Sequence, residues 1–240
     1  KPLFWVVVLV VAVSLSICYF YFFFSDAQVS KLTVVGQKTL TLNSIETIIW
    51  ESVNKNILGV SSASIFAVNR KGIEKKLLTT FPLLKEVVVQ KHFFNEIIVN
   101  ITEREPVGIF CGNQSECFFI DNNGVVFQSH QVVPEGMVVI KKQQTVSVGD
   151  AVVEKNIIEG ILAIQKSLKE NYKIDMQEVL VSNPIIIKTS ERWQLYLDPR
   201  ADISLQVSKM NALLTNEITP TTRKQLEYIY LQYKDRAYYK

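Results

Sequence analysis

Residues 86–103 read EVVVQKHFFNEIIVNITE and contain two runs that favour β-strands. In the second run, Ile97, Val99 and Ile101 fall at every second position, which is the period of a strand with one buried face. The first run, residues 86–91, is rich in valine, a residue enriched in strands. We therefore expect two strands here, residues 86–91 and residues 96–103.

A third strand and a helix are expected upstream of this pair. Leu32, Val34 and Val35 lie in a short run typical of a β-strand, which ends near Gly36. Asn43 can cap a following helix, with Glu46 three residues later as its capping-box partner. The apolar residues of that helix fall at helical spacing on one face: Ile45, Ile48, Ile49 and Val53.

A second helix is expected to begin at Asn69 and to end before Pro82, which blocks its continuation. Its apolar stripe consists of Ile73, Leu77 and Phe81. Residues 54–67 show no clear period, and we expect a loop there. The order strand, helix, helix, strand, strand predicts two helices on one face of a small three-stranded sheet, with a single core between them.

Beyond Pro106 the pattern changes to short apolar runs separated by turns. Asp121-Asn122-Asn123-Gly124 is a strong hairpin turn signal. Helical stripes begin at Ile157 and Ile203. We expect a β-rich second domain with packed helices and with strands at residues 107–110, 117–120, 125–127, 138–140, 179–181, 185–187, 193–197, 226–231 and 237–239. The predicted fold class is α+β.

Residues 3–24 read LFWVVVLVVAVSLSICYFYFFF, a stretch of 22 residues without charge. As a helix it would be about 33 Å long, enough to cross a hydrocarbon core. A cleaved signal peptide is the alternative, because Ser25-Asp26-Ala27 fits its cleavage pattern. However, the apolar region exceeds the roughly 7–15 residues of a signal. We expect a single membrane span and three parts: an anchor (1–27), a small domain (28–106) and a β domain (107–240).

The charged and histidine residues give no sign of catalysis or of nucleic-acid binding. The net charge is +3, and no block of five like charges occurs. The chain has only two histidines, His92 and His130, and its carboxylates are scattered. No phosphate-binding glycine loop is present. We therefore expect no enzyme activity, no cofactor, no metal, no nucleic-acid partner and no small-molecule substrate.

Cys111 and Cys117 enclose a five-residue segment, GNQSE, between two apolar runs. In an oxidising compartment they can close a hairpin loop as a disulfide. The alternatives are two free thiols or half of a metal site. A metal site would need further ligands, which two histidines hardly supply, so we favour the disulfide.

The C-terminal stretch, residues 228–240, reads YIYLQYKDRAYYK and holds five tyrosines. They fit ordinary β propensity, and they fit equally well a binding surface, where tyrosine offers a large contact area with a polar tip. A terminal strand at a sheet edge can also accept a strand from another chain. The composition leaves both interpretations open.

The order of these parts resembles the FtsQ/DivIB family of bacterial cell-division proteins, and the small domain resembles a POTRA domain. Six stretches spread over the chain carry the resemblance: VVG (34–36), IFAVN (65–69), FPLLKEVVV (81–89), ITEREP (101–106), FIDNNGVV (119–126) and the tail 228–240. Each motif is weak alone, but their order and spacing are specific.

The resemblance implies a scaffold of the division machinery at the inner cell membrane, with most of the chain outside the cytoplasm. Such proteins bind two small single-span coiled-coil proteins, FtsB and FtsL. One partner adds a strand to the edge of the β domain, and the POTRA domain helps recruitment. Tyr233 aligns with the family's partner-binding tyrosine, while Gln232 stands where an arginine is common. The implied partner-binding residues are Gln232, Tyr233, Arg236, Ala237, Tyr238 and Tyr239.

Two other classes of protein share some of these features. A POTRA-bearing component of a translocation or envelope-assembly system is the main alternative. Such a component would need a long uninterrupted run of strands after Pro106, and two helical stripes interrupt that region. A membrane-tethered cell-wall hydrolase would need a nucleophile or metal set that the sequence does not offer.

Overall fold

The computed structural model describes residues 2–24, 27–57, 60–92, 95–113, 116–130, 134 and 136–240. Ser25 and Asp26 of the alternative cleavage pattern lie outside the described residues. The chain divides into two compact units, Lys1–Arg104 and Glu105–Lys240.

The N-terminal helix α1 (Pro2–Phe23) has 22 residues. Across the part of the chain that the structure describes, no helix meets the combined length and apolarity that a membrane crossing requires. The membrane span expected over residues 3–24 therefore stays a prediction.

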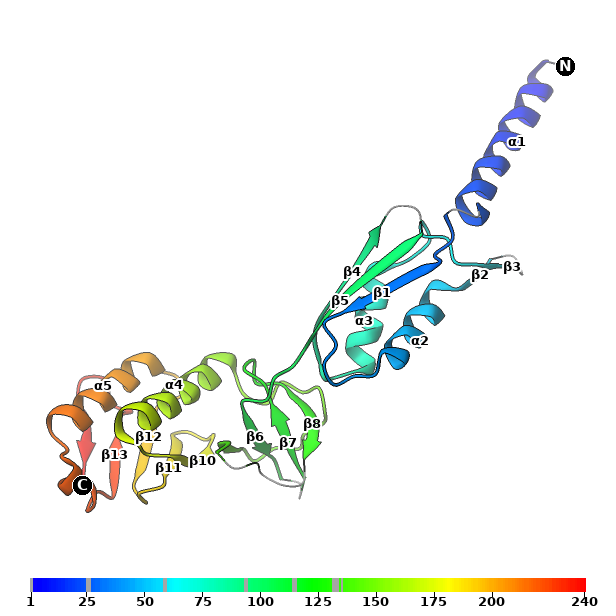
Figure 1. Ribbon diagram of the computed structural model, residues 1–240. Coiled ribbons are helices and arrows are strands. Elements are labelled where there is room, and N and C mark those ends of the chain that lie inside the picture. The colour runs from blue at the N-terminus through cyan, green and yellow to red at the C-terminus, as the bar shows by residue number, and fades with distance from the viewer. Residues whose placement is uncertain are drawn as a thin grey trace. The chain divides into compact units, whose positions relative to one another are not determined.

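The first unit also contains a mixed α and β domain (Figure 1). Its three-stranded sheet has the order β1-β5-β4, with β1 parallel to β5 and β4 antiparallel to β5. Helices α2 and α3 pack on one face, where Ile45 and Leu77 join Ile97 and Val99 in one buried cluster. The elements are β1 (Lys31–Val35), α2 (Leu42–Val53), β2 (Lys55–Ile57), β3 (Val60–Ser62), α3 (Arg70–Thr80), β4 (Leu84–His92) and β5 (Glu96–Glu103).

Two local features differ from the sequence prediction for this unit. Helix α2 begins at Leu42 with Thr41 as its N-cap residue, and no side chain caps it. The predicted Asn43–Glu46 capping box is therefore wrong, because Asn43 already lies inside the first turn. The predicted loop at 54–67 contains a small hairpin, β2–β3. By contrast, Asn69 caps α3 as predicted, since its side chain accepts a hydrogen bond from the Gly72 N–H at 3.1 Å.

A buried carboxylate closes the connection between β1 and α2. Glu103 is 5% exposed, and its Oε1 accepts hydrogen bonds from the backbone N–H groups of Lys38, Thr39 and Leu40 at 2.8, 3.0 and 3.2 Å. Burial acts to raise the pKa of Glu103, but these three hydrogen bonds outweigh it and leave the pKa below its ordinary value. The ionised carboxylate therefore stabilises this connection.

Replacing Glu103 with glutamine should lower the stability of this unit by about 1 kcal/mol or more at pH 7, because hydrogen bonds to a charged acceptor are stronger than those to an amide. A depressed folded-state pKa contributes stability that is present above the ordinary glutamate pKa and is lost as the pH falls through the folded pKa. The difference between the two proteins should therefore shrink on acidification. Urea unfolding at a series of pH values measures this, and a difference independent of pH would contradict it.

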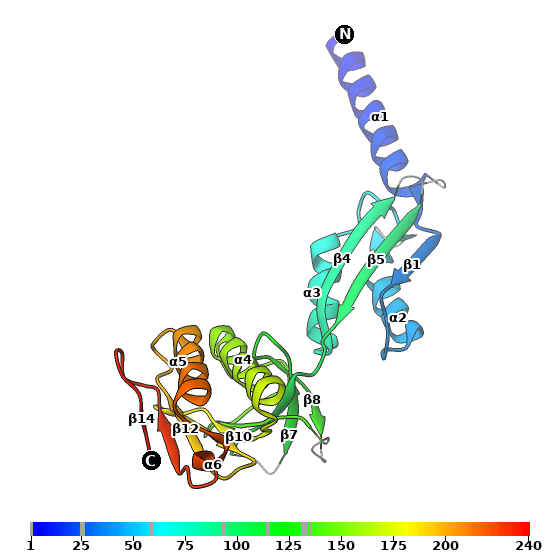
Figure 2. The same cartoon turned by 60° about the vertical axis from the view of Figure 1, so that its left-hand side comes forward.

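The second unit is built on a nine-stranded sheet of order β14-β13-β12-β11-β10-β9-β6-β7-β8. Helices α4 and α5 lie together on one face (Figure 2) and share a buried core with Trp193 and Phe110. The strands are β6 (Gly108–Cys111), β7 (Cys117–Ile120), β8 (Val126–His130), β9 (Val139–Lys141), β10 (Met176–Leu180), β11 (Ile185–Thr189), β12 (Gln194–Leu197), β13 (Tyr228–Tyr230) and β14 (Tyr238–Tyr239). The helices are α4 (Lys155–Tyr172), α5 (Ile203–Asn216) and α6 (Pro220–Arg223).

Cys111 and Cys117 are joined by a disulfide in the structure. They are direct partners in the β6–β7 ladder, with their Cα atoms 4.4 Å apart. The strand pairing alone thus brings the two cysteines together.

Replacing both cysteines with serine should destabilise the protein by no more than about 2–3 kcal/mol, because the loop that the disulfide closes is short. The unreduced wild-type chain should have a mass two protons below that of the reduced chain. Mass spectrometry with and without reductant checks this. Free alkylation of both Cys111 and Cys117 without reductant would contradict the disulfide.

Candidate partner-binding edge of the β domain

Strand β14 forms one edge of the nine-stranded sheet, and its hydrogen-bond register decides which backbone groups it offers to solvent. Lys240 and Tyr228 exchange two hydrogen bonds, at 3.2 and 3.3 Å. Hydrogen-bonded pairs alternate in an antiparallel ladder, so Tyr238 is the next residue bonded to β13. The N–H and C=O groups of Tyr239, and of Ala237 where the chain stays extended, therefore point away from the sheet.

Tyrosine rings surround this edge. Tyr233 and Tyr238 are 45% and 46% exposed, and their rings meet edge to face with centroids 5.3 Å apart. Arg236 donates a hydrogen bond from Nη1 to the Tyr238 hydroxyl at 3.3 Å, and this bond raises the pKa of Arg236. The edge thus combines outward backbone groups of β14, two exposed tyrosines and the guanidinium of Arg236.

The turn that leads into β14 is held by the rest of the β domain. Lys209 of α5 donates a hydrogen bond from Nζ to the carbonyl oxygen of Tyr233 at 2.6 Å. Ala237 packs against the core, and Gln232 is partly exposed. Lys209 could not be predicted from the sequence, because a contact between residues so far apart in the chain leaves no periodic signal.

The structure brings four of the six predicted partner-binding residues close together. Tyr233, Arg236 and Tyr238 are linked by ring contact and hydrogen bond, and Tyr239 follows on the edge strand. Gln232 and Ala237 lie in the same turn, but no side-chain contact between them and these four is recorded among the described residues.

The uncovered sheet face next to the edge carries more tyrosine than the sequence analysis assigned to a site. The rings of Tyr196 and Tyr230 lie 4.6 Å apart, and those of Tyr228 and Tyr230 lie 4.5 Å apart. Desolvation, with a smaller contribution from Tyr196, raises the pKa of Tyr230. The signal was available, because Gln194-Leu195-Tyr196-Leu197 alternates with a period of two. This period does not reveal that β12 pairs with β13, which places Tyr196 beside Tyr230.

A comparison with protein families finds that residues 27–104 match the family model of the POTRA domain, FtsQ-type. The chain carries an FtsQ-type POTRA domain. This match supports the resemblance to the FtsQ/DivIB family that the sequence motifs suggested. No curated protein matches the sequence.

The FtsQ-type POTRA domain suggests a role as a cell-division scaffold that acts through protein–protein interaction. It covers the strand–helix–helix–strand–strand part of the first unit, from just before β1 to just after β5. The β14 edge lies outside the matched residues, so the family match carries no information about binding at this edge.

Proposed function

We propose that this FtsQ-type protein is a non-enzymatic scaffold of the division machinery and binds FtsB-like and FtsL-like single-span partners outside the cytoplasm. The FtsQ-type POTRA domain supports the division role. The observation that carries the binding mode is the β14 edge, where the backbone groups of Tyr239 point away from β13. A partner strand laid along this edge would gain main-chain hydrogen bonds and would meet Tyr233 and Tyr238.

The proposal includes attachment to the inner cell membrane by one span. Its support is the sequence: residues 3–24 carry no charge and are long enough, as a helix, for the hydrocarbon core. An extracytoplasmic position for the remaining chain fits a Cys111–Cys117 disulfide, because disulfides persist in oxidising compartments.

A fluorescent fusion of the full chain in dividing bacteria tests the function. We expect a band at mid-cell and recovery of FtsB-like and FtsL-like partners with the affinity-tagged protein. A diffuse envelope signal in dividing cells, with neither partner recovered, would refute the division role. An enzyme active only in the cytoplasm, fused after Lys240, should be inactive, and activity there would refute the proposed topology.

A further inference from the structure

The protein has another sheet edge with outward backbone groups, formed by strand β1 of the POTRA domain. Lys31 donates its N–H to the Asn95 carbonyl oxygen at 3.2 Å, which fixes the register of the parallel β1–β5 pair. Alternate residues of a parallel strand bond to the same neighbour, so Lys31, Thr33 and Val35 face β5. The N–H and C=O groups of Leu32 and Val34 therefore face outward.

The same edge already holds another backbone segment just upstream. Val29 donates its N–H to the Ala63 carbonyl oxygen at 2.9 Å, and Ile65 donates to the Ala27 carbonyl oxygen at 2.8 Å. This internal pairing stops before Leu32. Among the backbone hydrogen bonds of the described residues, none reaches the outward groups of Leu32 or Val34. The first part of this edge therefore already pairs with another backbone segment, which shows that the edge can bind a strand. The part formed by Leu32 and Val34 has no such partner among the described residues.

The opposite edge of the sheet, strand β4, is protected in a way that β1 is not. The Glu74 side chain on α3 accepts a hydrogen bond from the Val89 N–H at 2.9 Å. Blocking an edge with a charged side chain is a common defence against unwanted strand pairing. The contrast indicates that β1, rather than β4, is the edge available to another chain.

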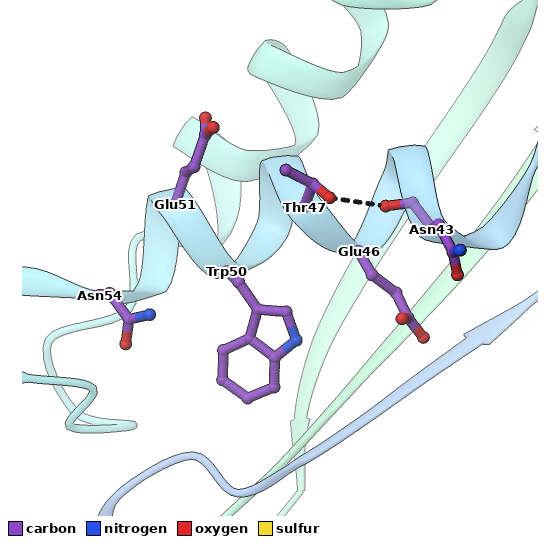
Figure 3. A pocket seen from close by; sticks show the side chains of 6 residues that line it. All are labelled: Asn43, Glu46, Thr47, Trp50, Glu51 and Asn54. Carbon is purple, nitrogen blue, oxygen red and sulfur yellow. Dashed lines mark hydrogen bonds between the residues drawn. The ribbon is translucent and has the colours of Figure 1, made fainter.

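Helix α2 lies beside the Leu32–Val34 part of the β1 edge, and its partly exposed residues next to this edge are called the α2 wall. A shallow cavity of about 570 Å³ runs along it, lined by Asn43, Glu46, Thr47, Trp50, Glu51 and Asn54. Figure 3 shows Glu46 and Trp50 on the side of α2 nearer β1, while Glu51 points the other way. Trp50 and Leu32 also border a common space in the core. The Trp50 ring therefore lies beside the β1 edge.

The charges of this wall favour a cationic ligand. Glu51 forms an ion pair with Lys76 at 3.0 Å, but no ion pair of Glu46 is recorded among the described residues. Glu46 is therefore the glutamate of the cavity that can meet a ligand at the β1 edge, and the lining residues include no lysine or arginine. An arginine held over the Trp50 ring and near Glu46 would gain both a cation–π contact and a charge pair.

We propose that the stretch Leu32–Val34 of β1 binds an extended segment of a partner protein in which arginine alternates with β-branched residues. Residues opposite Leu32 and Val34 point toward the α2 wall, where Trp50 and Glu46 recognise arginine. The intervening residues lie on the uncovered sheet face beside Thr33 and Val35, where β-branched side chains pack well. This site is separate from the β14 edge and gives the scaffold a second docking surface.

A seven-residue synthetic peptide that alternates arginine and valine serves as the probe, with glutamate in place of arginine in the control peptide. Both are titrated against the full chain. We expect slower hydrogen exchange at the amides of Leu32 and Val34 with the arginine peptide only. Glu46→Lys should weaken its binding about tenfold or more. The matched control Glu86→Lys, on β4, should leave binding unchanged.

Val34→Pro removes an outward N–H and should also abolish the exchange protection at Leu32, since proline is tolerated at an edge strand. Thermal melts and the Glu46→Lys variant separate this effect from a folding defect. Equal binding of the two peptides, or protection of Tyr239 rather than Leu32, would overturn the proposal. So would a concentration-dependent dimer that Val34→Pro dissociates, because a second copy would then occupy the edge. If no peptide binds at β1, the proposed binding of a partner strand at β14 is not affected, because it is measured separately with the Ala237 and Tyr233 variants.

Discussion

Replacing Ala237 with proline should lower the affinity for an FtsB-like strand about thirtyfold or more. Where the chain stays extended before β14, the register of the strand directs the Ala237 N–H away from β13. Proline then removes a donor that an incoming strand would use and spares the protein's own ladder. The fixed backbone angle of proline also suits an edge position. The loss is thus expected in binding and not in folding.

Cutting Tyr233 to alanine should have an effect of similar size. Tyr233 is 45% exposed and its ring meets that of Tyr238 edge to face, so it offers apolar area without forming part of the core. Anchors of this type typically cost about 2 kcal/mol or more when removed, which corresponds to about thirtyfold in affinity. The backbone of Tyr233 stays tied to Lys209 through its carbonyl oxygen, and this contact survives the substitution.

Both variants are measured by pull-down and titration of the partner segment, with a thermal melt of each protein. Ala237→Ser is the control for the first, because it keeps the N–H and nearly the same volume. Leu205→Ala is the control for the second, because Leu205 is also an exposed apolar residue of the β domain, 51% exposed, and lies on α5. Weak binding with an unchanged melt supports the edge site. Full binding by both variants would place the interface elsewhere.

The sequence predicted a strand at residues 237–239, close to β14, but the direction of its donors could not be read from the sequence. That direction depends on which residue of β13 lies opposite Lys240, and a shift of one residue would exchange Ala237 with Tyr238. The same limit explains why Tyr196 was missed as a neighbour. Local period places a residue on a face, whereas pairing between distant strands decides what it lies beside.

In the fold too, features set by neighbouring residues were predicted, whereas contacts between distant segments were not. The strand pattern of residues 96–103 and the Asn69 cap are local signals, and the structure has both. The hairpin β2–β3 was missed because its strands have three residues each, too few to show a period. The placement of β9 between β6 and β10 joins segments far apart in the chain, and no residue pattern within them encodes it.

The turn at Gly124 was predicted from the local sequence, but its contact with a distant segment was not. The sequence predicted a turn at Asp121–Gly124, and the structure has Gly124 at φ 77° with its N–H donated to the Asp121 carbonyl oxygen at 3.0 Å. The sequence did not reveal that Val153 lies against this turn. The Val152 N–H bonds to the Gly124 carbonyl oxygen at 2.8 Å, and a Cβ at Gly124 would overlap the Val153 carbonyl oxygen.

Replacing Gly124 with alanine should therefore destabilise the β domain by about 3 kcal/mol or more. The left-handed backbone costs an L-residue about 1–2 kcal/mol, and the rest comes from displacing the Val153 backbone and the hydrogen bond beside it. Gly149→Ala is the matched control. Gly149 also has a positive φ, 100°, but no atom lies within 4 Å of a Cβ there, so only the backbone cost of about 1–2 kcal/mol applies. Urea unfolding of both variants gives the comparison. If the two substitutions destabilise the protein equally, the overlap of a Cβ with the Val153 backbone has no energetic cost. The left-handed backbone alone then explains the glycine at position 124.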